Sequence, residues 1–112
     1  MADYTYQEKR QYQRRECYTE AYLYKDKDGG KESDYKATMK NYSQGGVYFC
    51  TDQALELHQP IYIQVRDVDE SAQGPEKYYE YAGYVKWSSD LGTSMPDGRY
   101  GYGIKYNVPV TY

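Results

Sequence analysis

Residues 61–66 alternate strictly between aliphatic side chains and polar or tyrosine side chains. On an extended chain, side chains two residues apart point to the same face. Ile61, Ile63 and Val65 are therefore expected to face a core, and the residues between and after them to face outward. Pro60 precedes the run, at the position where a missing N–H disturbs a sheet least. The alternation predicts a half-buried β-strand.

Other short runs of the same kind follow one another along the chain, separated by turn and loop residues. They cover residues 17–25, 34–42, 47–50, 78–88 and 100–108. The intervening Asp26–Gly30 is typical of a hairpin turn, and residues 52–59 predict either a single helical turn or a loop. Because no long stretch shows helical periodicity, we expect an all-β sandwich or a small barrel.

Alternation also assigns side chains in these runs to faces. Tyr35, Ala37 and Met39 share one parity and are expected on one side of their strand. Gly83 interrupts the run 78–88 and predicts a bend or a bulge there. Two further sets are each expected to share a face: Tyr79, Tyr81, Val85 and Trp87, and Tyr102, Ile104, Tyr106 and Val108, with Gly101 and Gly103 opposite the second set.

The stretch 41–46, Asn-Tyr-Ser-Gln-Gly-Gly, lies between two of the predicted strands. Asn41 and Ser43 continue the parity of Met39 and would present an amide and a hydroxyl on one face. Gly45 and Gly46 allow the backbone to turn and allow a flat ligand to approach closely. The stretch predicts a small polar shelf at the end of a strand.

The aliphatic content of the chain is low for a folded protein. Leu, Ile, Val and Phe account for 14 of the 112 residues, below the share of about one fifth that is usual in globular domains. The 18 tyrosines supply the missing apolar area, because each ring is a large hydrophobic body with a polar tip. With a net charge of only −3, self-repulsion is weak, and we expect one folded domain.

Basic residues cluster near the start of the chain, at Lys9, Arg10, Arg14 and Arg15, although the whole chain is acidic. Such a patch suits a small anionic ligand better than a long nucleic acid, which would be repelled elsewhere on the surface. Residues 1–15 show neither helical nor strand periodicity. They predict a flexible N-terminal arm, followed by a folded domain over residues 16–112.

The sequence gives no support for an enzyme or a metalloprotein. Cys17 and Cys50 lie far apart and are expected to be free thiols, with a single disulfide as the alternative. His58 is the single histidine, so a metal site built from several histidines cannot form. We expect no cofactor. Without a signal peptide or an apolar run near ~20 residues, the chain is expected to be cytoplasmic and not inserted in a membrane.

Two short patterns occur together. Arg10 and Arg14 form R-x-x-x-R, and Asn41, Ser43 and Gly46 form N-x-S-x-x-G before the third predicted strand. In this combination the sequence resembles the PilZ domain, the bacterial receptor domain for cyclic di-GMP, whose patterns are RxxxR and [D/N]xSxxG. The resemblance extends from about residue 8 to residue 108, and it includes the later stretches 59–65, 82–87 and 101–106.

The resemblance implies a small six-stranded antiparallel β-barrel of the split PilZ type and a receptor or adaptor function rather than catalysis. The cyclic di-GMP-binding residues that it implies are Arg10, Arg14, Asn41, Ser43 and Gly46, with Lys9, Arg15 and Gly45 as additional contacts. Arginine suits this ligand because its planar fork of donors fits both phosphate oxygens and the O6/N7 edge of guanine. Asn41 offers one carbonyl acceptor to guanine, where an aspartate would offer two oxygens.

Three functions remain open at this point. In the first, the ligand neutralises the arm, orders it across the barrel and so changes a surface that an effector protein reads. In the second, the chain is a PilZ-like protein-interaction module that no longer binds ligand. In the third, a tyrosine-rich barrel face binds single-stranded nucleic acid, although the acidic total counts against this function. The number of ligand molecules that bind is not predicted.

Overall fold

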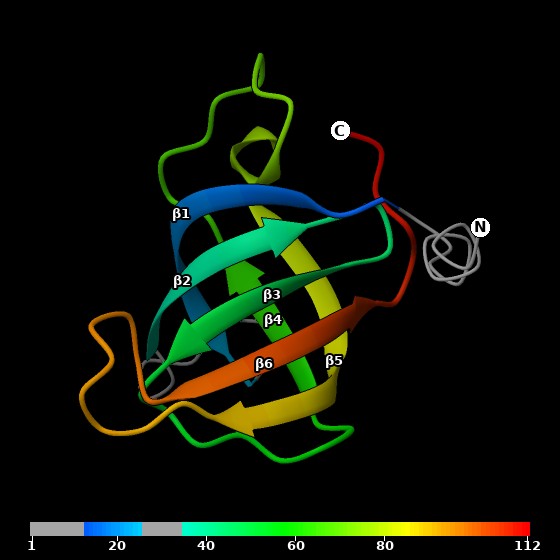
Figure 1. The fold of residues 1–112 in the computed structure, drawn as a ribbon. Helices are drawn as coiled ribbons and strands as arrows, with labels where there is room; N and C mark the ends of the chain where they lie inside the picture. Colours follow the sequence, from blue (N-terminus) through cyan, green and yellow to red (C-terminus); the bar gives the residue numbers. More distant parts are fainter. Residues whose placement is uncertain (1–12, 26–34) are drawn as a thin grey trace, which may run out of the picture.

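The computed structural model describes residues 13–25 and 35–112, which form an antiparallel β-barrel (Figure 1). Its strands are β1 (Arg15–Tyr24), β2 (Tyr35–Tyr42), β3 (Gly46–Thr51), β4 (Pro60–Gln64), β5 (Glu80–Asp90) and β6 (Tyr100–Tyr106). Around the barrel they follow the order β1-β2-β3-β6-β5-β4 and close on themselves. The predicted six-stranded barrel is therefore confirmed. Residues 1–12, which include most of the predicted arm, lie outside the described residues.

One connection follows one of its two predicted alternatives, and another contains an element that was not predicted. Residues 52–59 form a loop and not a helical turn, and His58 adopts a φ of 68° within it. The long connection from β4 to β5 contains a short 3-10 helix, η1 (Pro75–Lys77), that the alternation did not predict. Proline favours such a start because its fixed φ suits the first helical position. Within the described residues, no helix is long and apolar enough to cross a membrane.

The core combines aliphatic side chains with buried tyrosines. Ile61, Ile63 and Val65 are almost completely buried, as predicted. Tyrosine rings supply much of the remaining core, and their hydroxyl groups have hydrogen-bond partners, as buried hydroxyls require. The pairs are the hydroxyl of Tyr42 with the Gln73 carbonyl, Tyr81 with the Pro75 carbonyl, Tyr106 with the Tyr112 hydroxyl, and Tyr102 with the Leu55 N–H, at 2.5–2.9 Å.

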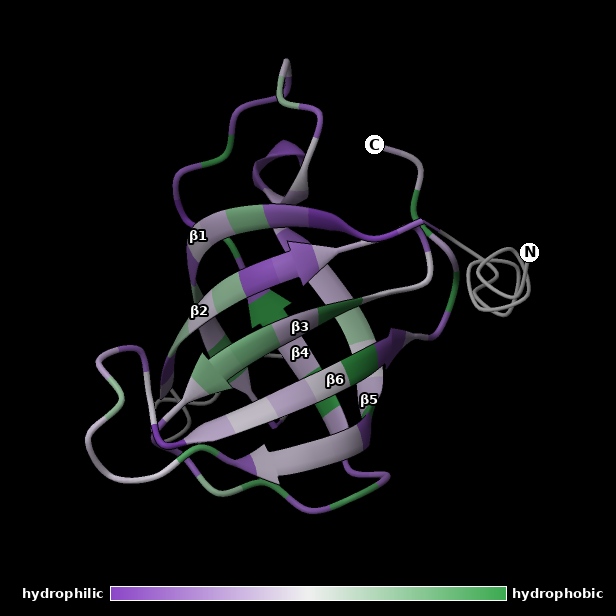
Figure 2. Ribbon diagram, in the orientation of Figure 1, coloured by the Kyte–Doolittle hydropathy of each residue, from purple (hydrophilic) through white to green (hydrophobic). Residues whose placement is uncertain are grey.

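A β-bulge in β2 reverses the alternation just before the polar shelf. Met39 pairs with Phe49, but the next pair across β2 and β3 is Asn41 with Tyr48, so Lys40 is an extra residue. The core face then continues through Tyr42 and not through Asn41. The predicted shared face of Met39 and Asn41 is therefore wrong, because a bulge shifts the side-chain period by one. The end of β2 is correspondingly hydrophilic in Figure 2.

A second bulge has the same effect in β5. Val85 pairs with Ile104 and Trp87 pairs with Gly103, which leaves Lys86 as the extra residue. Val85 is fully buried, whereas Trp87 is 37% exposed. The predicted common face of Tyr79, Tyr81, Val85 and Trp87 thus holds only for Tyr81 and Val85, since Tyr79 precedes β5 and is exposed. A bulge was predicted at Gly83, but it lies three residues further along, at Lys86.

The end of the chain packs against one end of the barrel. β6 ends at Tyr106, so Val108 is 73% exposed and does not continue the buried face as predicted. Further on, the Val110 N–H donates to the Gln44 carbonyl at 2.8 Å. The Tyr112 ring meets the Tyr42 ring edge-on, with centroids 5.0 Å apart. Residues 107–112 therefore help to hold the connection between β2 and β3.

We expect Gly46→Ala to destabilise the barrel by about 1–3 kcal/mol, the usual cost of overpacking. A Cβ at Gly46 would lie 2.1 Å from the Ile104 carbonyl oxygen. That atom belongs to the backbone of β6, so the two strands would have to separate. Denaturant unfolding of the variant and the wild type measures the difference. An unchanged unfolding midpoint would contradict the close approach of β3 and β6.

Candidate functional site

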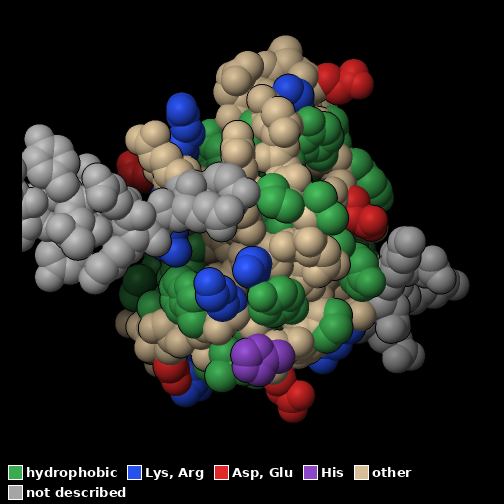
Figure 3. All heavy atoms as spheres, turned by 90° about the vertical axis from the view of Figure 1, so that its right-hand side faces the viewer, with side chains coloured by type: hydrophobic (Ala, Val, Ile, Leu, Met, Phe, Trp, Pro, Cys, Tyr) green, Lys and Arg blue, Asp and Glu red, His purple; other side chains and the backbone are tan. Residues whose placement is uncertain are grey.

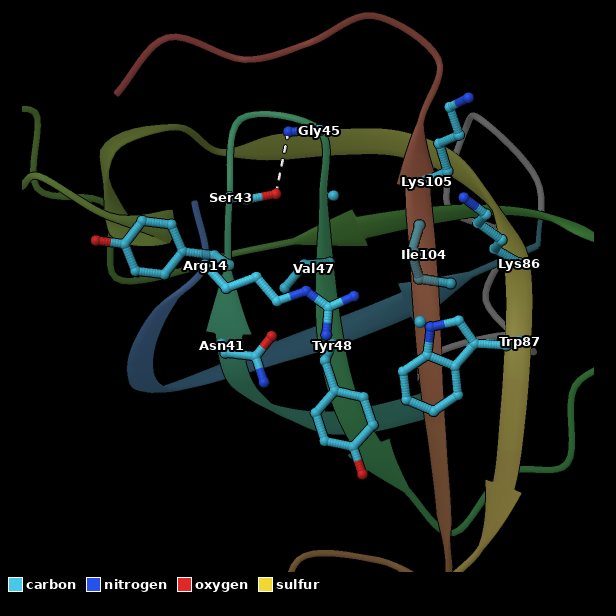
Figure 4. Close-up of a pocket in the computed structure, with 13 residues that line it drawn as sticks. Arg14, Asn41, Ser43, Gly45, Val47, Tyr48, Lys86, Trp87, Ile104 and Lys105 are labelled. Atoms are coloured by element: carbon cyan, nitrogen blue, oxygen red, sulfur yellow. Dashed lines mark hydrogen bonds between the residues drawn. The ribbon is translucent and has the colours of Figure 1, made fainter. Parts of the chain in front are cut away.

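A pocket of about 370 Å³ lies where the β2–β3 turn, β3, β6 and β5 meet (Figure 4). Its lining combines a polar turn, an aromatic pair and three basic side chains. The residues are Arg14, Asn41, Tyr42, Ser43, Gly45, Gly46, Val47, Tyr48, Lys86, Trp87, Gly103, Ile104 and Lys105. Asn41 and Trp87 reach it because each follows a bulge. The pocket thus depends on the two places where the strand alternation breaks.

Most of the residues predicted for the ligand site come together in this pocket. Arg14, Asn41, Ser43 and both glycines of the shelf line it. Arg15 begins β1 and is not among the lining residues. Lys9 and Arg10 lie outside the described residues. The role of all these side chains in ligand binding remains a prediction.

The polar turn is held by its own backbone and by neighbouring segments. The Ser43 N–H donates to the Gly46 carbonyl at 2.9 Å, and the Ser43 hydroxyl oxygen accepts a bond from the Gly45 N–H at 3.2 Å. The Tyr106 N–H donates to the Gly45 carbonyl at 2.9 Å. Because the Ser43 hydroxyl only accepts in this bond, it can still donate a hydrogen bond to another group. The Asn41 side chain makes no hydrogen bond within the described part of the chain. Its carbonyl oxygen can therefore accept a hydrogen bond and its NH2 group can donate one.

Two aromatic rings form one wall of the pocket, and the sequence did not predict their place. The rings of Tyr48 and Trp87 stack with centroids 5.2 Å apart and planes 14° apart. They cover the glycines of β6: a Cβ on Gly103 would lie 2.1 Å from Trp87 Nε1, and one on Gly101 would lie 2.3 Å from the Tyr48 hydroxyl oxygen. The two outward glycines were therefore a usable signal, because a strand without side chains on one face leaves room for flat rings.

The Tyr48 hydroxyl remains protonated at neutral pH. Burial raises its pKa to about 12, and the hydrogen bond with the Cys50 thiol, at 3.7 Å, acts in the same direction. The ring therefore contributes an uncharged surface beside Trp87. Both Cys17 and Cys50 are free thiols, as predicted.

Among the residues that the structure describes, the charged groups of the pocket are all basic. Arg14 enters from the β2 side, while Lys86 and Lys105 extend from β5 and β6 on the other side (Figure 4). No aspartate or glutamate is among the lining residues. In the space-filling view, basic side chains lie near the middle of this face and acidic ones lie toward its edges (Figure 3). Uncompensated cations in a concave site attract anionic ligands.

The bulge in β2 is braced by a side-chain cluster. The Lys40 ammonium is bonded to the Asp97 carboxylate and lies 4.6 Å from the centroid of the Tyr18 ring. The Tyr18 hydroxyl donates to the same carboxylate at 2.7 Å. These bonds lower the pKa of Asp97, with the Lys40 bond the larger cause, and the Asp97 bond raises the pKa of Lys40. The loop between β5 and β6 is thereby attached to the residue that precedes Asn41.

The described residues hold no group of three or more His, Cys, Asp or Glu side chains that could bind a metal ion.

A family model for the PilZ domain matches residues 8–111. The chain belongs to the PilZ domain family. PilZ domains are binding modules of the cyclic di-GMP-receptor type, not a known class of enzyme.

A solved structure shares the PilZ fold. The Bacillus subtilis inhibitor of motility, MotI/DgrA, superposes with a TM-score of 0.59 at 13% sequence identity. The alignment covers 90% of the present chain but only 43% of that protein. At this identity the likeness shows the fold alone. No curated protein sequence matches this chain.

We expect Gly103→Ala to displace Trp87, which is the single tryptophan of the chain. The added Cβ would meet the indole ring, which can swing aside, so the loss of stability should be smaller than for Gly46→Ala. The displaced indole should be more hydrated and should emit at a longer wavelength. Ser89→Ala, an exposed change on β5, the strand that carries Trp87, is the control. Identical emission from Gly103→Ala and wild type would refute the contact.

Proposed function

We propose that this PilZ domain is a receptor for cyclic di-GMP and that the ligand binds in the pocket beside the polar turn. The single observation that carries the proposal is the composition of that pocket. It combines an arginine, an amide and hydroxyl pair, and a partly exposed indole, with no carboxylate from residues 13–25 or 35–112. A guanine dinucleotide has phosphate oxygens for the arginine, guanine edges for the amide and hydroxyl, and flat bases for the indole.

Each side chain has a chemical role in this proposal. The Arg14 guanidinium binds phosphate oxygens or the O6/N7 edge of a guanine. The Asn41 carbonyl accepts from the N1–H and N2–H of a guanine, and the Ser43 hydroxyl donates nearby. The Trp87 ring provides a stacking surface, since every base has a flat face that can pack on an aromatic side chain. Gly46 contributes the close packing of β3 on β6 that shapes the turn.

The proposal extends to the N-terminal arm and to a partner. Arg10 and Lys9 lie outside the described residues, and we assign Arg10 to the ligand as the second arginine of the R-x-x-x-R pattern. Binding then orders residues near Arg14 over the pocket and creates a surface for an effector protein. We place this activity in the bacterial cytoplasm.

Cyclic di-GMP should quench the Trp87 fluorescence of the wild type in a saturable titration, because a stacked guanine lies on the indole. Arg14→Ala should weaken binding by about tenfold to a hundredfold, as expected for loss of a charge-assisted hydrogen bond. Arg99→Ala is the matched control, because Arg99 pairs with Asp90 away from the pocket. Calorimetry provides an independent measure of the same affinities.

The same titration separates the alternatives. A wild-type protein that gives neither quenching nor heat with cyclic di-GMP would be a PilZ-like interaction module without ligand. Equal affinities of Arg14→Ala and Arg99→Ala would remove Arg14 from the site. Binding of a single-stranded oligonucleotide with comparable strength at low salt would favour the nucleic-acid function instead.

Asn41→Asp should strengthen cyclic di-GMP binding by about fivefold, because a carboxylate accepts the two guanine N–H groups in charge-assisted bonds. Asn41→Ala should weaken binding. Calorimetric titration of the two variants at neutral pH and fixed salt tests the pair. If the aspartate variant bound more weakly than the alanine variant, the carbonyl of Asn41 would not be the guanine acceptor.

A further inference from the structure

Lys86 and Lys105 lie on neighbouring strands at the side of the pocket away from Arg14 (Figure 4). Lys86 is the bulged residue of β5, and the bulge leaves it exposed at the pocket together with Trp87. Lys105 of β6 pairs across the sheet with Gly46 on one side and Tyr84 on the other. Neither lysine belongs to the R-x-x-x-R or N-x-S-x-x-G pattern. Both nevertheless line the same pocket as those residues.

Three other cations on the barrel are neutralised by carboxylates. Lys36 pairs with Glu20, Lys40 with Asp97 and Arg99 with Asp90. In contrast, neither Lys86 nor Lys105 forms an ion pair with any residue in 13–25 or 35–112. Two ammonium groups that share a pocket without a carboxylate repel one another. A bound anion would remove that repulsion.

We propose that Lys86 and Lys105 form a second phosphate-binding site within the pocket, separate from Arg14. This inference rests on the proposed cyclic di-GMP function and adds the basis of ligand selection. A cyclic dinucleotide carries two phosphodiesters on opposite sides of its sugar–phosphate ring. One phosphate binds on the Arg14 side, the Trp87 ring packs against a base, and the other phosphate binds between the two lysines.

The consequence is a preference for ligands that have two phosphates. Each lysine is exposed at the rim of the pocket, so solvent weakens its attraction for phosphate relative to a buried charge. Removing both charges should therefore lower the affinity for cyclic di-GMP by about tenfold. The same change should lower the affinity much less for a ligand that has the same two guanines but only one phosphodiester.

The test uses the full chain and two ligands. Cyclic di-GMP and the linear dinucleoside monophosphate GpG are titrated by calorimetry against the wild type and Lys86→Gln/Lys105→Gln. The control is Lys25→Gln/Lys77→Gln, which removes the same charge from residues that do not line the pocket. Circular dichroism checks that all three proteins fold alike. Comparing the ratio of the two affinities within each protein cancels the difference between a cyclic and a linear ligand.

We expect the preference for cyclic di-GMP over GpG to fall about tenfold in Lys86→Gln/Lys105→Gln and to stay unchanged in the control. If wild type binds cyclic di-GMP and the pocket variant keeps the same preference, the second phosphate site is refuted while the proposed function stands. An equal loss for both ligands would also refute it, since only a general charge effect would remain. If wild type does not bind cyclic di-GMP at all, both the inference and the proposed function fail.

Discussion

The direction of the pocket side chains depends on two extra residues, Lys40 in β2 and Lys86 in β5. Each bulge interrupts a ladder of backbone hydrogen bonds and turns the next side chain from the core to the pocket. Asn41 and Trp87 are the side chains turned in this way. The bulge in β2 is stabilised by the bond of Lys40 to Asp97 and by the cation–π contact of Lys40 with the Tyr18 ring. A perfectly regular barrel of the same sequence would bury both groups and have no such pocket.

The two glycines on the outer face of β6 act together with these bulges in forming the pocket. Gly101 and Gly103 present no side chains on the outer face, so the rings of Tyr48 and Trp87 lie against the strand. Because the rings are supported from below and stacked on each other, they lose little further freedom when a ligand packs on them. The polar turn lies on one side of this apolar wall and the two lysines lie on the other, so polar groups of a ligand can be bound on both sides of the rings. The pocket is thus largely formed before a ligand arrives.

Sequence alternation predicted the strands correctly, and the two patterns predicted that Arg14, Asn41 and Ser43 belong to one site, which the fold brings together. The same alternation failed at Asn41 and Trp87, since a bulge depends on the register between strands and leaves no mark in local periodicity. For that reason Trp87 was expected on the same face as Val85, and the neighbouring lysines were not recognised. The contribution of Lys9 and Arg10 stays a prediction, because both lie outside the described residues.

The bulge at Lys86 also lies on an unpaired edge of β5. Beyond Tyr84, β5 extends past the end of its pairing with β4, so its edge from Lys86 to Asp90 has no strand partner on that side among the described residues. Unpaired edges are templates for intermolecular sheets, and a lysine or a bulge on such an edge discourages pairing. Lys86 supplies both. The same Lys86 ammonium that we propose to contact phosphate is therefore also expected to discourage edge-to-edge pairing of the free protein.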